Sequence, residues 1–148
     1  GDAALYMIES DMKALVIRRA ESTAPVSILG SRPGMALPLH CGGAPSVLLA
    51  FSSQPFIDTY LSGPLERRTD KTCTDPDMIR QKLSEIRARG YSIAQEDLFE
   101  YVVAVGAPVY DEKDRLAGAI SVGNIPQRYP PERIEEVGRI LLEEIARY

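Results

Sequence analysis

His40 and Cys41 are the neighbouring side chains of this sequence best suited to chemistry, since they are its one histidine and one of its two cysteines. A thiolate nucleophile needs a base within hydrogen-bonding reach of its sulfur, yet neighbouring residues of an extended segment point in opposite directions. A zinc site needs three or four ligands, which one histidine and the widely spaced Cys41 and Cys73 do not supply. We therefore expect no catalytic dyad, no metal site and no cofactor.

The segment that follows, Gly42 to Ser46, has the composition of a loop that leads into a helix, because Pro45 is tolerated in the first helical turn. Amide groups at a helix N-terminus lack intrahelical partners and point toward one spot, which favours an anion there. An ordinary helix start would show the same residues. An anion site at this helix start is therefore one of two open interpretations.

Small residues are frequent in two apolar runs, residues 101–110 and 116–124. A charged, turn-forming segment between the runs predicts that they form a β-hairpin. Glycine inside a strand costs stability and often marks a place where a ligand or another backbone comes close. Either the hairpin packs tightly under a helix, or it frames a small-molecule pocket together with the glycine-rich helix start.

Acidic residues at Glu96, Asp97 and Glu100 could hold a general base, although a solvated loop is the simpler interpretation of such a cluster. The sequence has no phosphate-binding glycine loop, no nucleophile elbow and no dinucleotide fingerprint. We therefore expect a protein that is not an enzyme.

Short β-rich runs make up the first part of the chain. Residues 3–9 and 14–20 predict a hairpin, and residues 26–29 predict a third strand. A further strand is expected at residues 91–94, before the small-residue hairpin. Because strands and helices do not alternate, this order predicts an α+β fold with an antiparallel sheet.

Helices are expected after the glycine-rich loop, at residues 54–61 and at the end of the chain. The clearest helix has Asp75 as its N-cap, Pro76 in its first turn and Gly90 as its stop. Its predicted core-facing stripe consists of Met78, Ile79, Leu83 and Ile86.

Composition and charge limit the class of protein. A chain of 148 residues suits one domain with its own core, and a net charge of −4 with scattered basic residues makes it a poor nucleic-acid binder by itself. No apolar run is long enough to span a bilayer, and two cysteines without a signal sequence are typical of a soluble protein in a reducing cytoplasm, with no membrane partner. Because it starts at Gly1 instead of Met, we expect a piece of a longer protein.

Five segments, in order and over nearly the whole chain, resemble the C-terminal effector-binding domain of the IclR (isocitrate lyase regulator) family of bacterial transcription factors. They are GMALPLHCGGAPSVLLAF, RRTDKTCTD, IRARGYSIAQED, VGAPVYDEKDRLAGAISVGNIPQRY and the closing helix. The resemblance implies an α+β, GAF-like fold, in which helices flank a curved antiparallel β-sheet of about six strands. It also implies that residues 1–148 form an effector-binding domain of a homodimer or tetramer. DNA would be bound only through an N-terminal winged helix-turn-helix domain, which is absent from this chain.

In similar proteins that bind small carboxylates, the pocket combines amides at the helix start, an acidic residue after the Gly-Tyr strand, a cysteine in one hairpin arm and two serines in the other. The acidic position falls on Ala94 or Gln95, and of the hairpin positions only Ser121 keeps the residue type. The ligand-binding residues so implied are Gly43, Ala44, Gln95, Ala104, Ser121, Gly123, Tyr101 and Met35.

This pocket is less polar than in binders of glyoxylate or pyruvate. We therefore expect a carboxylate-bearing catabolic metabolite with an aliphatic or aromatic body, because the remaining amides and Ser121 still offer donors to a desolvated carboxylate. The expected walls are Val26, Ile28, Met35, Phe99 and Tyr101.

Two alternatives stay open. One is a GAF-like dimerisation module whose pocket is filled by Phe99 and Tyr101. The other is a GAF-fold thiol redox enzyme, which would have a low pKa at Cys41 and use Cys73 as the resolving cysteine.

Overall fold

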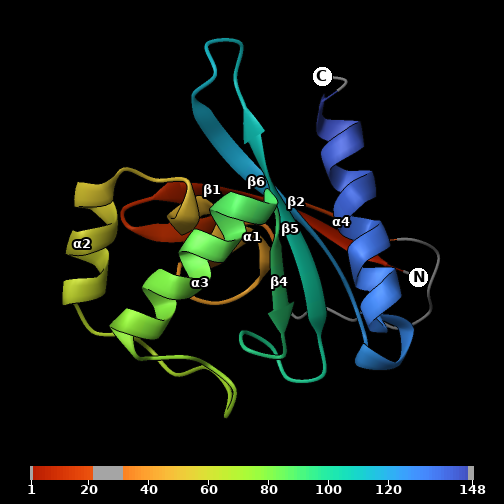
Figure 1. Cartoon of the computed structure of the whole chain (residues 1–148), viewed down its shortest axis with the longest axis horizontal. Coiled ribbons are helices and arrows are strands. Elements are labelled where there is room, and N and C mark those ends of the chain that lie inside the picture. The colour runs from red at the N-terminus through yellow and green to blue at the C-terminus, as the bar shows by residue number, and fades with distance from the viewer. Residues whose placement is uncertain (1, 22–31, 147–148) are drawn as a thin grey trace.

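The computed structural model describes residues 2–21 and 32–146, and its framework is one curved antiparallel sheet in the order β3-β2-β1-β6-β5-β4 (Figure 1). Every neighbouring pair of strands is antiparallel. The predicted α+β fold with a six-stranded antiparallel sheet is confirmed. The strands are β1 (Ala3–Ser10), β2 (Lys13–Glu21), β3 (Ala36–Leu37), β4 (Ser92–Gln95), β5 (Val103–Tyr110) and β6 (Leu116–Asn124).

Both hairpins predicted from the sequence form. A two-residue turn at Asp11 and Met12 joins β1 to β2, and the φ angles of these residues, 51° and 62°, are the left-handed values that suit tight hairpins. β5 and β6 pair along their length around the charged turn. The edge strand beside β2 is the short β3, whereas the run at residues 26–29, predicted as a strand, lies outside the described residues.

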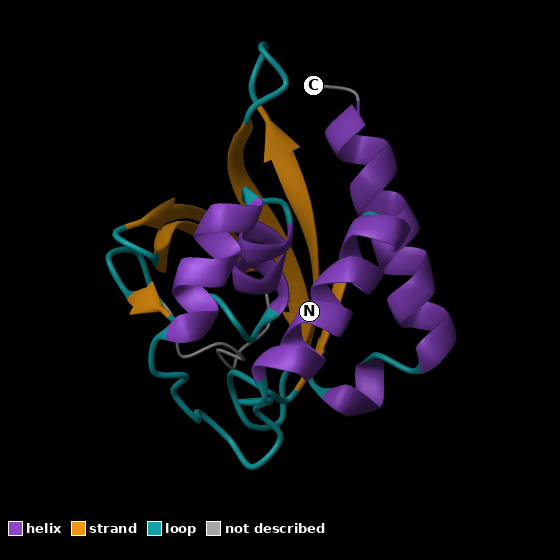
Figure 2. Cartoon of the chain, turned by 60° about the vertical axis from the view of Figure 1, so that its left-hand side comes forward, coloured by secondary structure: helices purple, strands orange, loops and turns teal. Residues whose placement is uncertain are grey.

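Three helices, α1 (Gly43–Ala50), α2 (Gln54–Ser62) and α3 (Pro76–Arg89), form the main core with one face of the sheet (Figures 1 and 2). In α3 the predicted limits are confirmed: the Asp75 carboxylate accepts a hydrogen bond from the amide of Asp77, and Gly90 ends the helix at φ 95°.

The prediction for one residue of the core-facing stripe of α3 is wrong. Met78 is 57% exposed, whereas Ile79, Leu83 and Ile86 are buried. Successive helical residues are rotated by about 100°, so Met78 lies beside the face that the other three share.

The fourth helix, α4 (Pro131–Ala146), follows a short 3-10 helix (Pro126–Arg128) and covers the opposite face of the sheet (Figure 1). Strand alternation assigns the residues of β5 to the two faces. Val103 and Val105 belong to the α4 core, while Ala104 and Gly106 lie toward α1. The same strand therefore supports two separate cores.

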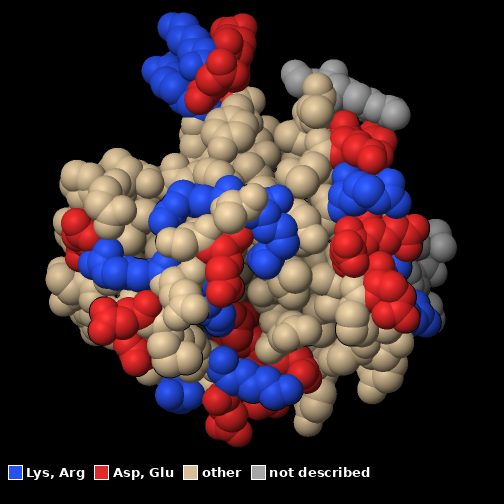
Figure 3. Space-filling model, in the orientation of Figure 1, with Lys and Arg blue, Asp and Glu red and all other residues tan. Residues whose placement is uncertain are grey.

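Within the described ranges, no helix is both long enough and apolar enough to cross a membrane. On the face drawn in Figure 3, acidic and basic side chains are interspersed at the tip of the β5–β6 hairpin and along α4. At these two places the surface therefore lacks the extended basic character that a nucleic-acid backbone requires.

Candidate ligand-binding site

The first turn of α1 rests directly on the β5–β6 hairpin. A Cβ atom added to Gly106 would overlap the carbonyl group of Gly43, and one added to Gly43 would lie 3.0 Å from the Cβ of Ser121. Ser92 on β4 secures the contact, because its Oγ donates a 2.6 Å hydrogen bond to the Gly43 carbonyl. The hairpin is thus packed tightly under a helix, and its glycine permits the close approach of two backbones.

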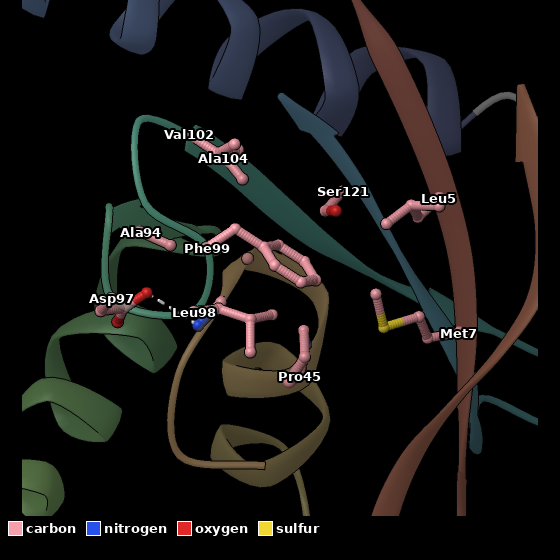
Figure 4. Close-up of a pocket in the computed structure, with 12 residues that line it drawn as sticks. Leu5, Met7, Pro45, Ala94, Asp97, Leu98, Phe99, Val102, Ala104 and Ser121 are labelled. Carbon is pink, nitrogen blue, oxygen red and sulfur yellow. Dashed lines mark hydrogen bonds between the residues drawn. The ribbon is translucent and has the colours of Figure 1, made fainter. Parts of the chain in front are cut away.

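A small cavity lies beside this contact, between the start of α1, the inner face of the sheet and the loop that joins β4 to β5 (Figure 4). Its volume is about 20 Å³, which is room for about one water molecule. Its wall is mostly apolar. The lining residues are Leu5, Met7, Gly42, Gly43, Pro45, Ala94, Asp97, Leu98, Phe99, Val102, Ala104 and Ser121.

Ser121 brings a hydroxyl group to this cavity from β6. Its side chain is only 4% exposed, and its Oγ makes no hydrogen bond to any described residue. The amides of the first turn of α1, which begins at Gly43, have no intrahelical partners. The Ser121 hydroxyl is therefore available to donate a hydrogen bond to a group that enters the cavity. This corner therefore combines a serine hydroxyl with the N-terminal amides of a helix.

Asp97 is the acidic group of the cavity. The residue is 7% exposed, and its carboxylate accepts a 2.9 Å hydrogen bond from the amide of Gly42, directly before α1. Desolvation by burial raises the pKa of Asp97 above its usual 3.8, and the hydrogen bond from Gly42 opposes that change. The carboxylate thereby ties the β4–β5 loop to the start of the helix.

The turn between α2 and α3 anchors the same loop from its other side. Thr69 Oγ1 donates a hydrogen bond to the carbonyl of Glu96 and Thr72 Oγ1 donates one to that of Asp97, each at 2.6 Å. The Lys71 ammonium lies 2.6 Å from the Glu96 carboxylate. The first two residues of the loop are therefore held by side chains from a distant part of the sequence.

His40 and Cys41 are structural residues. The Nε2 of His40 lies 2.7 Å from the carbonyl of Glu66, which can only accept, so Nε2 carries the proton; Nδ1 lies 2.8 Å from the hydroxyl of Tyr60. Cys41 is fully buried, and desolvation raises its pKa to about 12, so its thiolate does not form near neutral pH. The thiol redox alternative predicted a low pKa for Cys41, and this prediction is wrong.

The family model described as the C-terminal domain of the bacterial transcriptional regulator IclR matches residues 3–147. The chain belongs to the IclR family. It is 31% identical to the HTH-type transcriptional repressor AllR of Klebsiella pneumoniae over 147 residues, which are 97% of this chain and 53% of the repressor. The chain thus spans about half the length of the curated relatives it matches. These relatives are transcriptional regulators, and this IclR-family domain is not an enzyme.

Two solved structures show how closely the fold is shared. The IclR of Thermotoga maritima has a TM-score of 0.90 and 26% identity, over 99% of this chain and 61% of that one. The inducer-binding domain of the transcription factor PobR from Acinetobacter, a double mutant in complex with 3-hydroxybenzoic acid, has a TM-score of 0.86. Its identity is 21%, over 98% of this chain and 85% of that one, so this likeness shows the fold alone.

Three of the eight residues implied as IclR-type ligand contacts line the cavity, and two more lie next to these in the chain or in the sheet. Gly43, Ala104 and Ser121 line the cavity. Ala44 is buried in the first turn of α1, and Gly123 lies opposite Ala104 across the β5–β6 pair. Residues from a helix start and from both hairpin arms thus come together, as the resemblance implies.

The other three lie elsewhere. Gln95 is exposed, while Ala94 lines the cavity, because neighbouring residues of a strand face opposite sides of a sheet. Tyr101 is 71% exposed, and Met35 is half-buried outside the lining. Of the expected walls, Phe99 lines the cavity, whereas Val26 and Ile28 lie outside the described residues. As ligand contacts, all eight residues remain predictions.

Asp97, Leu5 and Met7 belong to the cavity although the sequence analysis did not place them there. No local sequence pattern distinguishes Asp97 from the acidic residues around it, because its hydrogen-bond donor, the amide of Gly42, lies 55 positions earlier in the sequence. A usable signal existed for Leu5 and Met7, since alternation along β1 places both on the face that Ala3 buries.

Proposed function

We propose that this domain binds a small carboxylate-bearing metabolite in the cavity at the start of α1, and thereby controls DNA binding by the helix-turn-helix domain of a longer IclR-family regulator. The observation that carries the proposal is Ser121, a residue that is 4% exposed and lines the cavity, and whose hydroxyl has no hydrogen-bond partner among the described residues. A carboxylate placed there would accept hydrogen bonds from Ser121 and from the first amides of α1.

The rest of the wall favours an effector with an apolar body. Leu5, Met7 and Leu98 offer no hydrogen bonds and would exclude water from a bound hydrocarbon or ring. The structural neighbour PobR, in complex with 3-hydroxybenzoic acid, supports testing hydroxybenzoates among the candidates. We therefore place the effector among catabolic acids larger than pyruvate.

Control of DNA binding would follow if the effector binds one arrangement of the regulator better than another. β6 offers a physical connection for this coupling. Ser121 lies on β6 three residues before Asn124, whose Nδ2 donates a 2.7 Å hydrogen bond to the Asp2 carboxylate. A DNA-binding domain that precedes this chain would be connected to it close to Asp2 in the sequence. The proposal includes a homodimer or tetramer in the cytoplasm, with DNA contacts made only by that domain.

A second candidate is a dimerisation module without an effector. It is favoured by the cavity volume of about 20 Å³, too small for any metabolite while Phe99 stands in it. Tyr101, which that alternative also expected in the pocket, is exposed.

A thermal-shift screen against metabolite acids, from pyruvate through benzoates to longer dicarboxylates, tests the proposal. A ligand that binds the native state must raise the melting temperature. We expect a selective rise, and an about tenfold or larger loss of affinity in Ser121→Ala, since a hydrogen bond to a charged group contributes about 1.5–3 kcal/mol. Ser62→Ala, an exposed serine on α2, is the matched control.

Two results would contradict the proposal. If no acid at millimolar concentration raises the melting temperature, the dimerisation module is the better function. If an acid binds equally well to the wild type and to Ser121→Ala, the site lies elsewhere.

A further inference from the structure

Phe99 stands inside the cavity that the proposed function assigns to the effector. Figure 4 shows its ring in the middle of the lining residues, with Ser121 and Leu5 on one side and Pro45 on the other. The side chain is half-buried, so it also reaches the surface. With the ring in place the remaining volume is about 20 Å³, less than any organic acid needs. The ring therefore takes up the space in which a ligand body would lie.

The loop that carries Phe99 is fastened at its beginning and closed at its base. Its first residues, Glu96 and Asp97, accept the two threonine hydrogen bonds described above, and the amide of Glu96 donates a 2.9 Å hydrogen bond to the carbonyl of Val102. Phe99 lies beyond these anchors. None of these hydrogen bonds involves Phe99 itself, so moving its ring does not require breaking them.

The loop also has two turning points where a change of direction is concentrated. Glu96 and Tyr101 have φ angles of 61° and 63°, left-handed values that are unfavourable for residues other than glycine. Tyr101 is 71% exposed at the end of the loop, and Phe99 is half-buried. The backbone geometry is thus that of a short loop held between two strained positions.

We propose that the ring of Phe99 is a built-in competitor of the effector, which binds only when the loop carries this ring out of the cavity. The inference rests on the proposed function and deepens it in one respect, the class of effector. A ligand that takes the place of the phenyl ring beside Ser121 is planar, has about the size of a ring and bears a carboxylate. The effector class is therefore that of aromatic or similarly sized cyclic acids, and acids as small as pyruvate leave the vacated space unfilled.

Benzoate is the probe for this proposal, and calorimetric titration of Phe99→Ala is the test. If the ring blocks the site in most molecules, the apparent affinity of the wild type is reduced by the fraction of molecules that are unblocked. Removing the ring removes this reduction. We therefore expect Phe99→Ala to bind benzoate about tenfold more tightly than the wild type does, or tighter still. Pyruvate should gain less. Phe56→Ala, which removes a half-buried ring from α2, is the matched control and should leave benzoate affinity unchanged.

The movement of the ring has its own measurement. The chain has three phenylalanines, Phe51, Phe56 and Phe99, so labelling with 4-fluorophenylalanine gives three ¹⁹F resonances. Phe99→Leu assigns the relevant one and also gives a milder variant for titration if Phe99→Ala does not fold. We expect saturating benzoate to shift the Phe99 resonance toward its position in the unfolded chain and to leave the other two in place.

The outcomes separate this proposal from the proposed function. If an acid stabilises the wild type, but Phe99→Ala and Phe99→Leu bind benzoate no more tightly and the Phe99 resonance stays in place, the competitor role is overturned and the effector site stands. If benzoate binds the Phe99 variants but no acid binds the wild type, the ring is a permanent filling of the pocket and the competitor role is overturned. If no acid binds to the wild type or to either Phe99 variant, both proposals are overturned.

Discussion

The two faces of the sheet differ in the size of the core and in the polar groups that they bury. The face under α1, α2 and α3 holds the larger core, and it also buries polar groups, among them Asp97, Ser92 and Ser121. The face under α4 holds a small cluster of buried residues, namely Val103, Val105, Tyr129, Ile134 and Val137. Only the first of these described cores adjoins the cavity proposed for the effector.

The difference shows that a single strand can serve stability and binding at once. Branched residues of β5 fill the α4 core, while the small residues between them let α1 approach the other face. Changes on the α4 face should therefore alter stability alone, and changes on the α1 face should alter stability and binding together.

The largest effect is expected where α1 meets β5. Gly106→Ala should lower the free energy of unfolding by about 3 kcal/mol or more, because the new methyl group would overlap the backbone of Gly43. Urea unfolding measures the loss. Gly63→Ala is the control, since its Cβ would meet its nearest neighbour at 3.6 Å. Equal effects at the two sites would show that the helix does not rest on the hairpin as described.

A smaller loss is expected on the α4 face. Ile134→Ala should lower the free energy of unfolding by about 2 kcal/mol and leave the affinity for any acid selected by the screen unchanged, because Ile134 is 4% exposed in the core remote from the cavity. Ile140→Ala, on the same helix but 39% exposed, should change stability by about 0.5 kcal/mol or less. A loss of ligand affinity in Ile134→Ala would mean that the two faces are coupled.

The third prediction concerns the pH dependence of stability on the cavity face. The pKa of Asp97 is raised in the folded protein, so the folded state binds this proton more tightly than the unfolded chain does. Its contribution to stability is therefore full at acidic pH and is lost as pH rises through the folded pKa.

Asp97→Asn removes this titration and keeps an oxygen for the amide of Gly42. Relative to this variant, the wild type should become less stable as pH rises from about 3.8 through the folded pKa and should then level off. Thermal unfolding over a pH series measures the gap, with Asp70→Asn at an exposed position as the control. A gap independent of pH would contradict the raised pKa.

The smallest effect on stability is expected for a change at one of the two cysteine thiols. In the native protein one thiol should react quickly with a disulfide reagent, namely that of the partly exposed Cys73, while Cys41 should react only on unfolding because it is buried with a pKa of about 12. Cys73→Ser should abolish the fast phase without a measurable loss of stability. A fast phase that remained would show that Cys41 is accessible.

The sequence by itself determined the elements that depend on local chemistry. Asp75, Pro76 and Gly90 mark the limits of α3 because caps, proline and glycine act within one turn of a helix. The hairpins followed from alternation and turn composition, and the order of motifs indicated the family. The helix start was predicted from its glycines and proline, whereas Ser121 was named only through the resemblance to the family.

Only the tertiary structure decided what the β4–β5 loop contributes. Asp97 is buried because Gly42 and Thr72 provide its partners, and these lie 55 and 25 positions away in the sequence. Ala94 rather than Gln95 lines the cavity because a shift of one residue in a strand changes the face of every side chain, and only pairing with β5 sets that register. The direction of Phe99 likewise depends on the path of a loop without periodic structure. Long-range contacts set these three features, so no local pattern could reveal them.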